Sequence, residues 1–250
     1  SRNLRADGTF DEELFRGRIV NMLESGSDIL DLGACSTRPG SESICEEEEW
    51  RRLEPALNIL ASEHAGVKIS IDTFRPAVVS RAFDIIGPFI VNDVSGGSEE
   101  MWSLLGRLHL PYIAMHTRGT PKNMQNLTDY DNVTEAVREF FVGIAAEADR
   151  HGVEDWILDP GFGFAKTVEQ NWQLLREMSV LQEFGKDILV GLSRKSFLFR
   201  PLGITPAEAL PSTQVADFIA LQNGADILRV HDVAEAVRTI KLYRLFNGVN

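Results

Sequence analysis

Short apolar runs alternate with longer amphipathic segments along the whole chain, and this alternation constrains the fold more than any other feature of the sequence. Seven runs read as strands, and a helical pattern follows each of them. They cover residues 28–33, 67–73, 89–94, 112–117, 156–161, 187–193 and 227–232. Continuous apolar runs are typical of strands covered by helices on both faces. We therefore predict an α/β fold with a parallel sheet and right-handed crossovers.

A closed sheet is favoured over an open one, because none of the seven runs reads as a blunted edge strand. The length of 250 residues suits a single TIM (β/α)8 barrel domain over residues 1–250. A helical pattern over residues 11–26 precedes the first run. An eight-stranded barrel would therefore lack its first strand here, and we expect the domain to be incomplete at its N-terminus.

The charge of the chain narrows the choice of partners. A formal net charge of -12 and a pI near 4.9 oppose binding to nucleic acid or to an anionic membrane. No apolar run approaches the roughly 20 residues of a membrane-spanning helix, and the first ten residues lack a signal-peptide core, so we expect a cytoplasmic protein.

Cys35 and Cys45 lack partners at zinc spacing and are expected to be free thiols. The acidic run Glu46 to Glu49 predicts a solvated helix start, not a metal site.

Polar side chains gather where the predicted strands end. In parallel barrels the reacting groups come from the carboxyl ends of several strands. Any one of these residues could simply cap a helix, but their recurrence at nearly every strand indicates a binding site. The residues concerned are Thr37, Arg38, Asp72, Asn92, Met115, Asp159, Lys195, Arg229 and His231.

The kinds of side chain indicate the kind of ligand. A carboxylate such as Asp159 beside an amide such as Asn92 suits a flat heterocycle with amidine-like N–H edges. Lys195 can donate to a ring atom, and Arg229 can stack its guanidinium on the ring face. Met115 and Phe164 would form the apolar walls. A second, strongly anionic group would be held by Arg38, Arg229 and His231.

The stretch DILVGLSRKS at residues 187–196 predicts a buried strand that ends in a polar turn and a short helix. Gly191 allows a ligand to approach the backbone. Lys195 and Ser196 fall in the first helical turn, where free N–H groups attract an anion. A capped helix with a solvated lysine is the alternative interpretation.

Seven ordered motifs that cover nearly the whole chain together resemble the dihydropteroate synthase family. They are STRPG from Ser36, IDT from Ile71, NDVSGG from Asn92, MH at Met115, DPGFGF from Asp159, SRKS from Ser193 and RVH from Arg229. The resemblance implies a pterin-binding TIM barrel. It also implies an enzyme of folate synthesis that joins 4-aminobenzoate to 7,8-dihydropterin-6-ylmethyl diphosphate, releases pyrophosphate and is inhibited by sulfonamides.

The resemblance also assigns roles to residues. It implies that the pterin is bound by Asp72, Asn92, Met115, Asp159, Phe164, Gly191, Lys195 and Arg229. It implies that the diphosphate is bound by Thr37, Arg38, Arg229 and His231. The 4-aminobenzoate is expected beside Pro39, Phe164, Lys195 and Ser196. The expected catalytic residues are Asp72, Lys195, Thr37 and Arg38, with Asp72 stabilising a cationic ring.

Two further expectations follow from the resemblance. The family uses Mg²⁺, held in part by an asparagine of an N-terminal loop that would lie before Ser1, so no metal ligand is expected in the present chain. The resemblance also implies a homodimer whose two copies are joined through their later helices.

Other functions remain open at the level of the sequence. A methyltetrahydrofolate–corrinoid methyltransferase resembles the same barrel, but STRPG, SRKS and RVH form an anion site for which a methyl donor has no need. A catalytically silent pterin-binding protein and a generic phosphate-binding barrel are the other two alternatives.

Overall fold

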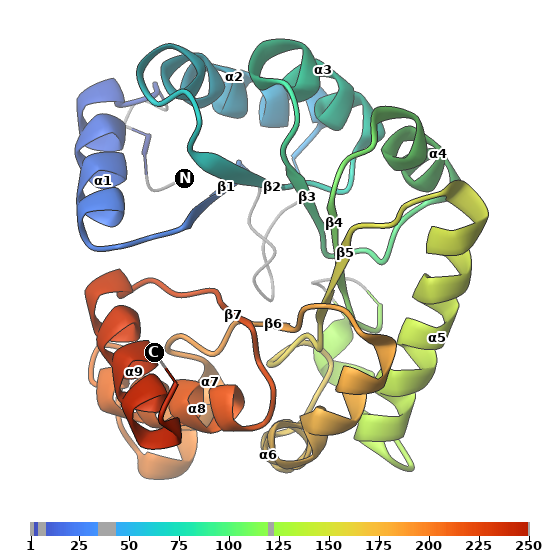
Figure 1. The fold of residues 1–250 in the computed structure, drawn as a ribbon, viewed down its shortest axis with the longest axis vertical. Helices are drawn as coiled ribbons and strands as arrows, with labels where there is room; N and C mark the ends of the chain where they lie inside the picture. The colour runs from blue at the N-terminus through green and yellow to red at the C-terminus, as the bar shows by residue number, and fades with distance from the viewer. Residues whose placement is uncertain (1–2, 5–8, 35–43, 120–122, 250) are drawn as a thin grey trace. The chain divides into compact units, whose positions relative to one another are not determined.

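The structure is a computed structural model that describes residues 3–4, 9–34, 44–119 and 123–249. Helices and strands alternate along these residues, as the sequence predicts (Figure 1). The strands are β1 (Ile29–Gly33), β2 (Lys68–Asp72), β3 (Ile90–Asp93), β4 (Tyr112–Met115), β5 (Trp156–Asp159), β6 (Leu189–Val190) and β7 (Ile227–Leu228). The helices are α1 (Glu12–Glu24), α2 (Glu46–Glu63), α3 (Pro76–Ile86), α4 (Glu99–Leu108), α5 (Val133–His151), α6 (Val168–Glu177), α7 (Ser196–Phe199), α8 (Leu210–Gln222) and α9 (Val233–Asn247), with 3₁₀ turns η1 (Met124–Asn126), η2 (Met178–Phe184) and η3 (Arg200–Leu202).

Two compact units make up the chain. The first unit comprises Ser1–Ala114 and Glu147–Trp156, and the second comprises Met115–Ala146 and Ile157–Asn250. Within the described residues, no helix combines the length and the apolar character that a membrane crossing requires.

The first unit is a parallel sheet covered by helices. β1 pairs with β2, β2 with β3 and β3 with β4, all parallel and in chain order. The register places Gly33 opposite Asp72, and Asp72 opposite Asn92. Figure 1 shows α2, α3 and α4 side by side along the sheet, and each contacts the next. The core between these layers is fully buried, as at Leu57, Ile71 and Val91. Because the strands are parallel, their carboxyl ends lie at one edge of the sheet.

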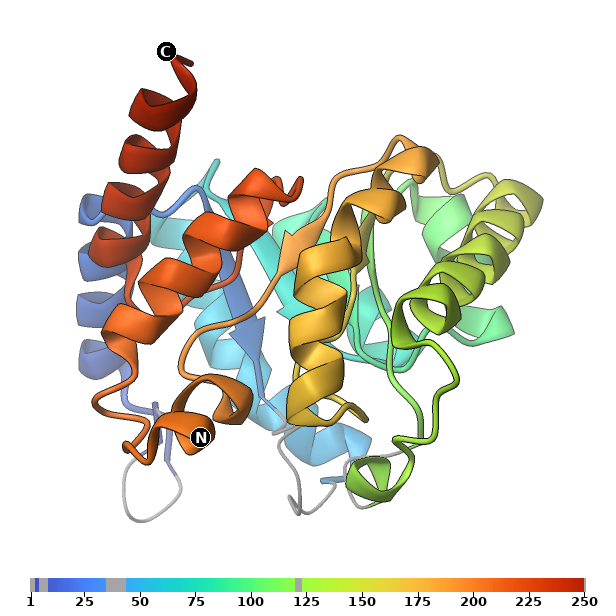
Figure 2. The same ribbon diagram turned by 90° about the horizontal axis from the view of Figure 1, so that it is seen from below.

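The second unit contains the parallel pair β6 and β7. Leu158 of β5 also forms a parallel bridge with Ile188, just before β6 begins. Helix α6 starts at a capping box in which Thr167 and Gln170 satisfy each other's backbone N–H groups. Helices α8 and α9 pack against each other, and Figure 2 shows them side by side.

All seven predicted strands are present, but the last two are much shorter than predicted. β6 has two residues instead of the seven of 187–193, and β7 has two instead of six. The ladder continues only as far as the bond from the Arg229 N–H to the Val190 carbonyl, 2.8 Å. After Gly191 the backbone forms a turn in which the Lys195 N–H donates to the Leu192 carbonyl at 3.1 Å, and the strand ends there.

Candidate active site

Asp72 and Asn92 stand at adjacent strand ends of the first unit. Asp72 ends β2 and is half-buried, and a side chain on Gly33 would lie 3.3 Å from its carboxylate. Asn92 is buried, and its Nδ2 lies 3.5 Å from Oδ1 of Asp31, which also accepts from Ser70 at 2.8 Å. The Oδ1 of Asn92 has no hydrogen-bond partner among the described residues. It is therefore a buried acceptor whose hydrogen-bonding capacity is unused among these residues.

Asp159 is the buried carboxylate of the second unit. Only 1% of it is exposed. Its Oδ1 accepts from the Gly161 N–H at 2.8 Å, and its Oδ2 lies 2.5 Å from NH2 of Arg229. Each carboxylate oxygen can accept a second hydrogen bond. Asp159 can therefore keep both partners and still receive N–H groups from a ligand.

Lys195 lies directly before α7 and reaches over the turn that follows β5. Its Nζ donates to the Phe162 carbonyl and lies 4.5 Å from the centre of the Phe164 ring. The pKa of Lys195 is lowered to about 7, mainly by burial; Asp159 acts in the opposite direction, and Arg229 acts in the same direction as burial. Lys195 is half-buried, so the alternative of a solvated lysine fits its surroundings less well than a place in a binding site, and its role in the site stays a prediction. Helix α7 itself has four residues and offers no separate anion site.

Arg229 and His231 extend from the end of β7, two residues apart. A side chain on Gly191 would lie 3.2 Å from Nε and NH2 of Arg229, so glycine leaves room for the flat guanidinium against the backbone. His231 is exposed, and its Nδ1 lies 3.2 Å from Oγ of Ser193. Arg229 thus places a cation beside Asp159, and His231 places a hydrogen-bonding group beside Ser193.

Arg194 ties the two turns of this region together. It has a left-handed backbone, φ 53°. Its guanidinium forms two 2.9 Å bonds to the Asp232 carboxylate, and its N–H donates to Oγ1 of Thr213 at 3.0 Å. Because Arg194 precedes Lys195 and Asp232 follows His231, this pair fixes the spacing of two predicted site residues.

The remaining predicted site residues have the following positions. Met115 ends β4 and is buried, whereas Phe164 and Ser196 are half-buried. The structure brings together Asp159, Phe164, Lys195, Gly191 and Arg229 through the contacts given above. Thr37, Arg38 and Pro39 lie outside the described residues.

Two buried residues of the second unit were missed by the sequence reasoning. Lys166 is 5% exposed and His116 is 3% exposed, and Nζ of Lys166 lies 2.9 Å from Nδ1 of His116. The pKa of Lys166 is lowered to about 7 and that of His116 to about 2, mainly by burial, and neighbouring cations act in the same direction. His116 was visible only as the neighbour of Met115, and Lys166 as a lysine two residues beyond the aromatic turn.

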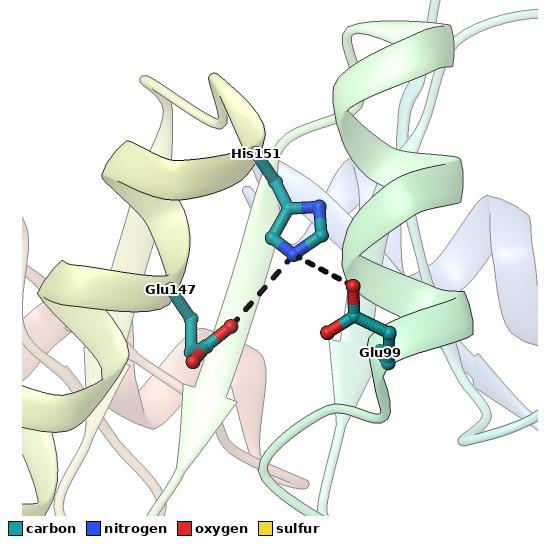
Figure 3. Close-up of side chains that lie close together, drawn as sticks. All are labelled: Glu99, Glu147 and His151. Atoms are coloured by element: carbon teal, nitrogen blue, oxygen red, sulfur yellow. Dashed lines mark ion pairs between the residues drawn. The ribbon is translucent and has the colours of Figure 1, made fainter.

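One group among the described residues has the composition of a metal site. Figure 3 shows Glu99 of α4 facing Glu147 and His151 of α5, with Nε2 of His151 at 3.5 Å and 3.7 Å from the two carboxylates. Arg150 already pairs with both glutamates, at 2.5 Å from Glu147, and Glu99 is largely exposed. The group is a surface network of ion pairs.

The chain is similar to known proteins over most of its length. A family model described as pterin binding enzyme matches residues 6–231. The dihydropteroate synthase of Synechocystis sp. is 42% identical over 226 residues, covering 88% of this chain and 78% of that protein.

Solved structures are similar over almost the whole chain. The dihydropteroate synthase of Yersinia pestis, in complex with a sulfonamide drug, has a TM-score of 0.89 and 32% identity and covers 94% of this chain and 86% of that one. The enzyme of Thermus thermophilus, in complex with 4-aminobenzoate, has a TM-score of 0.85 and 36% identity and covers 92% and 88%. These likenesses confirm the predicted fold class, α/β of the TIM (β/α)8 barrel type.

Proposed function

The chain belongs to the pterin-binding enzyme family, and from this membership we propose that it is a dihydropteroate synthase. Such an enzyme joins 4-aminobenzoate to (7,8-dihydropterin-6-yl)methyl diphosphate and releases pyrophosphate, a step of folate synthesis. One observation of the structure carries this proposal furthest: a buried carboxylate, Asp159, lies between Arg229 and the aromatic turn that Lys195 contacts.

This arrangement has the parts that a pterin requires. Asp159 faces the amidine-like N–H groups of the ring, where a carboxylate forms strong charge-assisted hydrogen bonds. Lys195 donates to a ring heteroatom, and the guanidinium of Arg229 stacks on the ring face. Met115 and Phe164 supply apolar surface.

The other roles within the proposal follow from the resemblance. Asp72 and Asn92 are assigned to the pterin, and Asn92 offers an unused buried acceptor for it. Phe164, Lys195 and Ser196, together with Pro39, are assigned to 4-aminobenzoate. The diphosphate falls to Arg229 and His231, with Thr37 and Arg38.

The residues fit the chemistry of the reaction. The bond from the exocyclic carbon to the diphosphate oxygen breaks, and pyrophosphate takes the electron pair. A bond forms from the arylamine nitrogen to the same carbon, and that nitrogen then loses a proton. Positive charge develops on the pterin and negative charge on the leaving group. Carboxylates such as Asp72 stabilise the positive charge on the pterin, and cations such as Arg229 stabilise the negative charge on the leaving pyrophosphate.

Mg²⁺ is a further part of the proposal. Mg²⁺ sites in proteins usually combine one or two carboxylates with substrate phosphates. Arg229, His231 and Ser193 offer no carboxylate, and Asp232 is engaged by Arg194. These residues alone do not fit a Mg²⁺ site, and we expect the metal to be held by diphosphate oxygens. Activity with and without a chelator tests the requirement.

We also propose that the protein is a cytoplasmic homodimer. Helices α8 and α9 carry exposed large apolar side chains at Val215, Leu242, Leu245 and Phe246. Exposed apolar surface of this kind is typical of a protein interface, and the resemblance places the dimer contact on the later helices.

Product formation tests the proposed function. The purified protein, 4-aminobenzoate, the pterin diphosphate and Mg²⁺ should give dihydropteroate and pyrophosphate in equal amounts, and a sulfonamide should compete with 4-aminobenzoate. Pterin binding without pyrophosphate release would contradict the proposal and favour a silent binding protein. Methyl transfer from methyltetrahydrofolate to cob(I)alamin would favour the methyltransferase.

An Arg229→Ala variant tests the anion role. Because the variant loses a charged hydrogen-bonding group, its dissociation constant for the pterin diphosphate should rise by about tenfold or more. A pterin without diphosphate should lose clearly less affinity. Equal losses for the two ligands in calorimetry would count against the assignment of Arg229 to the diphosphate.

A further inference from the structure

Lys166 is a buried lysine for which the reaction described above has no use. Its Nζ has three partners in the second unit: Nδ1 of His116 at 2.9 Å, the Gly161 carbonyl at 2.9 Å and the Phe164 carbonyl at 3.1 Å. An ammonium group has three N–H donors and no acceptor. The number of partners therefore equals the number of donors, so this side chain is fully satisfied as a cation.

Keeping a cation in this place is costly. Lys166 is 5% exposed, and burial lowers its pKa to about 7, while the charge of Asp159 partly offsets this effect. Removing a charge from water costs several kcal/mol unless partners replace the water. A leucine or methionine would fill the space without this cost, so the three hydrogen bonds are what distinguishes lysine here.

These hydrogen bonds add to the bond from the Phe164 N–H to the Gly161 carbonyl, 3.1 Å, in holding a turn of unusual backbone conformation. Gly161 has φ 68°, and a side chain there would lie 1.9 Å from the His116 carbonyl oxygen. Ala165 also has a positive φ, 47°, which costs energy for a residue other than glycine. Lys166 donates to one carbonyl at each end of the segment from Gly161 to Phe164 and so holds the two ends close together.

The same turn presents groups of the proposed pterin site. The Gly161 N–H donates to Asp159, the Phe162 carbonyl accepts from Lys195, and the Phe164 ring lies under the Lys195 ammonium. Gly163 also donates to Oδ1 of Asn171 at 2.6 Å. The position of the turn therefore sets both the carboxylate and the lysine that would face the ring.

We propose that Lys166, oriented by His116, is a positioning residue that holds the turn from Gly161 to Phe164 in the shape that pterin recognition needs. This inference rests on the proposed function and deepens it. His116 accepts through Nδ1, since a neutral imidazole next to an ammonium offers its unprotonated nitrogen. Lys166 itself does not touch the substrate; it acts through Asp159, Lys195 and Phe164.

The test compares Lys166→Met with two variants. Lys166→Met keeps the length of the side chain but donates to neither carbonyl, so the dissociation constant for 6-hydroxymethyl-7,8-dihydropterin should rise by about tenfold or more. Lys166→Gln keeps two N–H donors and should recover part of this loss. Lys68→Met, which removes an exposed lysine at the start of β2, should bind as the wild type does. Calorimetry gives the dissociation constants, and circular dichroism identifies the variants that fold.

The melting temperature, measured together with the pterin affinity, distinguishes a positioning role of Lys166 from a purely stabilising one. If Lys166 only stabilised the fold, Lys166→Met would melt at a lower temperature and the folded protein would bind the pterin normally; that result would overturn the inference. If Lys166→Met does not fold, a folded Lys166→Gln with unchanged affinity would overturn it equally. A wild-type protein that binds the pterin but forms no dihydropteroate would overturn only the proposed function. A wild-type protein that does not bind the pterin would overturn both.

Discussion

Glu49 and Arg75 form an ion pair in the first unit that is almost closed to water. The Glu49 side chain is 1% exposed and that of Arg75 is 15% exposed. Arg75 also donates to the Ile44 carbonyl at 2.6 Å and stacks over Phe74. This network connects the start of α2 with the start of α3, so a change in either residue should affect the stability of the whole unit.

Arg75→Met should lower the free energy of unfolding by about 3 to 5 kcal/mol, because it leaves the Glu49 carboxylate buried without a counter-charge. Arg81→Met is the matched control: its pair with Glu47 is exposed, and its loss should cost about 1 kcal/mol or less. Urea denaturation of the two variants measures the difference. Equal losses would show that Glu49 is better solvated than its burial indicates.

Lys195→Ala should weaken pterin binding by about 10- to 150-fold, the range expected for a hydrogen bond from a charged group. The fold should persist, because Lys195 is half-buried at the edge of the turn and not in the apolar core. Lys68→Ala, at an exposed lysine, is the control. Calorimetry with the pterin alone is the measurement, and an unchanged dissociation constant would remove Lys195 from the site.

Individual residues show where sequence reasoning stopped. The four glutamates at positions 46–49 were predicted to be solvated, and this was wrong for Glu49, whose partner lies 26 residues further along the chain. Asp159 and Lys195 were predicted as site residues because strand ends and motifs mark them, and these roles stay predictions. Lys166 was not predicted, since its proposed role comes from three contacts that only the folded turn creates.

At the level of single elements, helix α8 carries a buried carboxylate. Asp217 is 2% exposed, and its Oδ1 has no hydrogen-bond partner among the described residues. Burial raises its pKa from 3.8 to about 7. The folded state therefore holds this proton more tightly than the unfolded state, and the stability so gained is complete below about pH 4 and is lost as the pH rises through about 7.

Asp217→Asn should remove this pH dependence. The quantity to compare is the free energy of unfolding of Asp217→Asn minus that of the wild type. This difference should be up to about 4 kcal/mol more favourable to the variant at about pH 8 than at low pH. Asp187→Asn, at an exposed aspartate, should show no such trend. Urea denaturation at low and high pH is the measurement, and parallel curves for Asp217→Asn and the wild type would contradict a neutral buried Asp217.

Helices were predicted more closely than the last strands. The long helix was expected from about residue 133 to 151, and α5 has these bounds, because its apolar periodicity persists over five turns. The strand of residues 187–193 shrank to Leu189–Val190. The apolar run was correct, but the backbone after Gly191 forms a turn closed by the bond from the Lys195 N–H to the Leu192 carbonyl, and the sequence alone did not show where this turn begins.

At the scale of the whole molecule, the alternation of strand and helix was sufficient to predict the fold class, because parallel strands with helical crossovers admit few arrangements. The single domain over residues 1–250 stays a prediction. The roles of Thr37, Arg38 and Pro39 also stay predictions, since these residues lie outside the described part of the chain. The assignment of the function depended on seven motifs in order, whereas physical reasoning alone reached a flat heterocycle and an anion.

The proposed homodimer leads to a prediction for α8 and α9. Stable protein interfaces bury about 800 Å² on each partner and have an apolar centre. Val215 of α8 is 61% exposed and Leu245 of α9 is 78% exposed. The double variant Val215→Glu, Leu245→Glu would bury four glutamates in a symmetric interface, two from each copy, and should therefore be monomeric.

Light scattering should give half the wild-type mass for this double variant, with an unchanged circular dichroism spectrum. Leu202→Glu is the control, because Leu202 is a 61% exposed leucine in η3, outside both helices, so its replacement should leave the mass unchanged. A double variant with the wild-type mass would place the contact elsewhere, and a monomeric wild type would end the dimer proposal. Pterin affinity should be the same in the monomeric variant, because Asp159, Lys195 and Arg229 come from a single chain and belong to one unit, in which Arg229 pairs with Asp159.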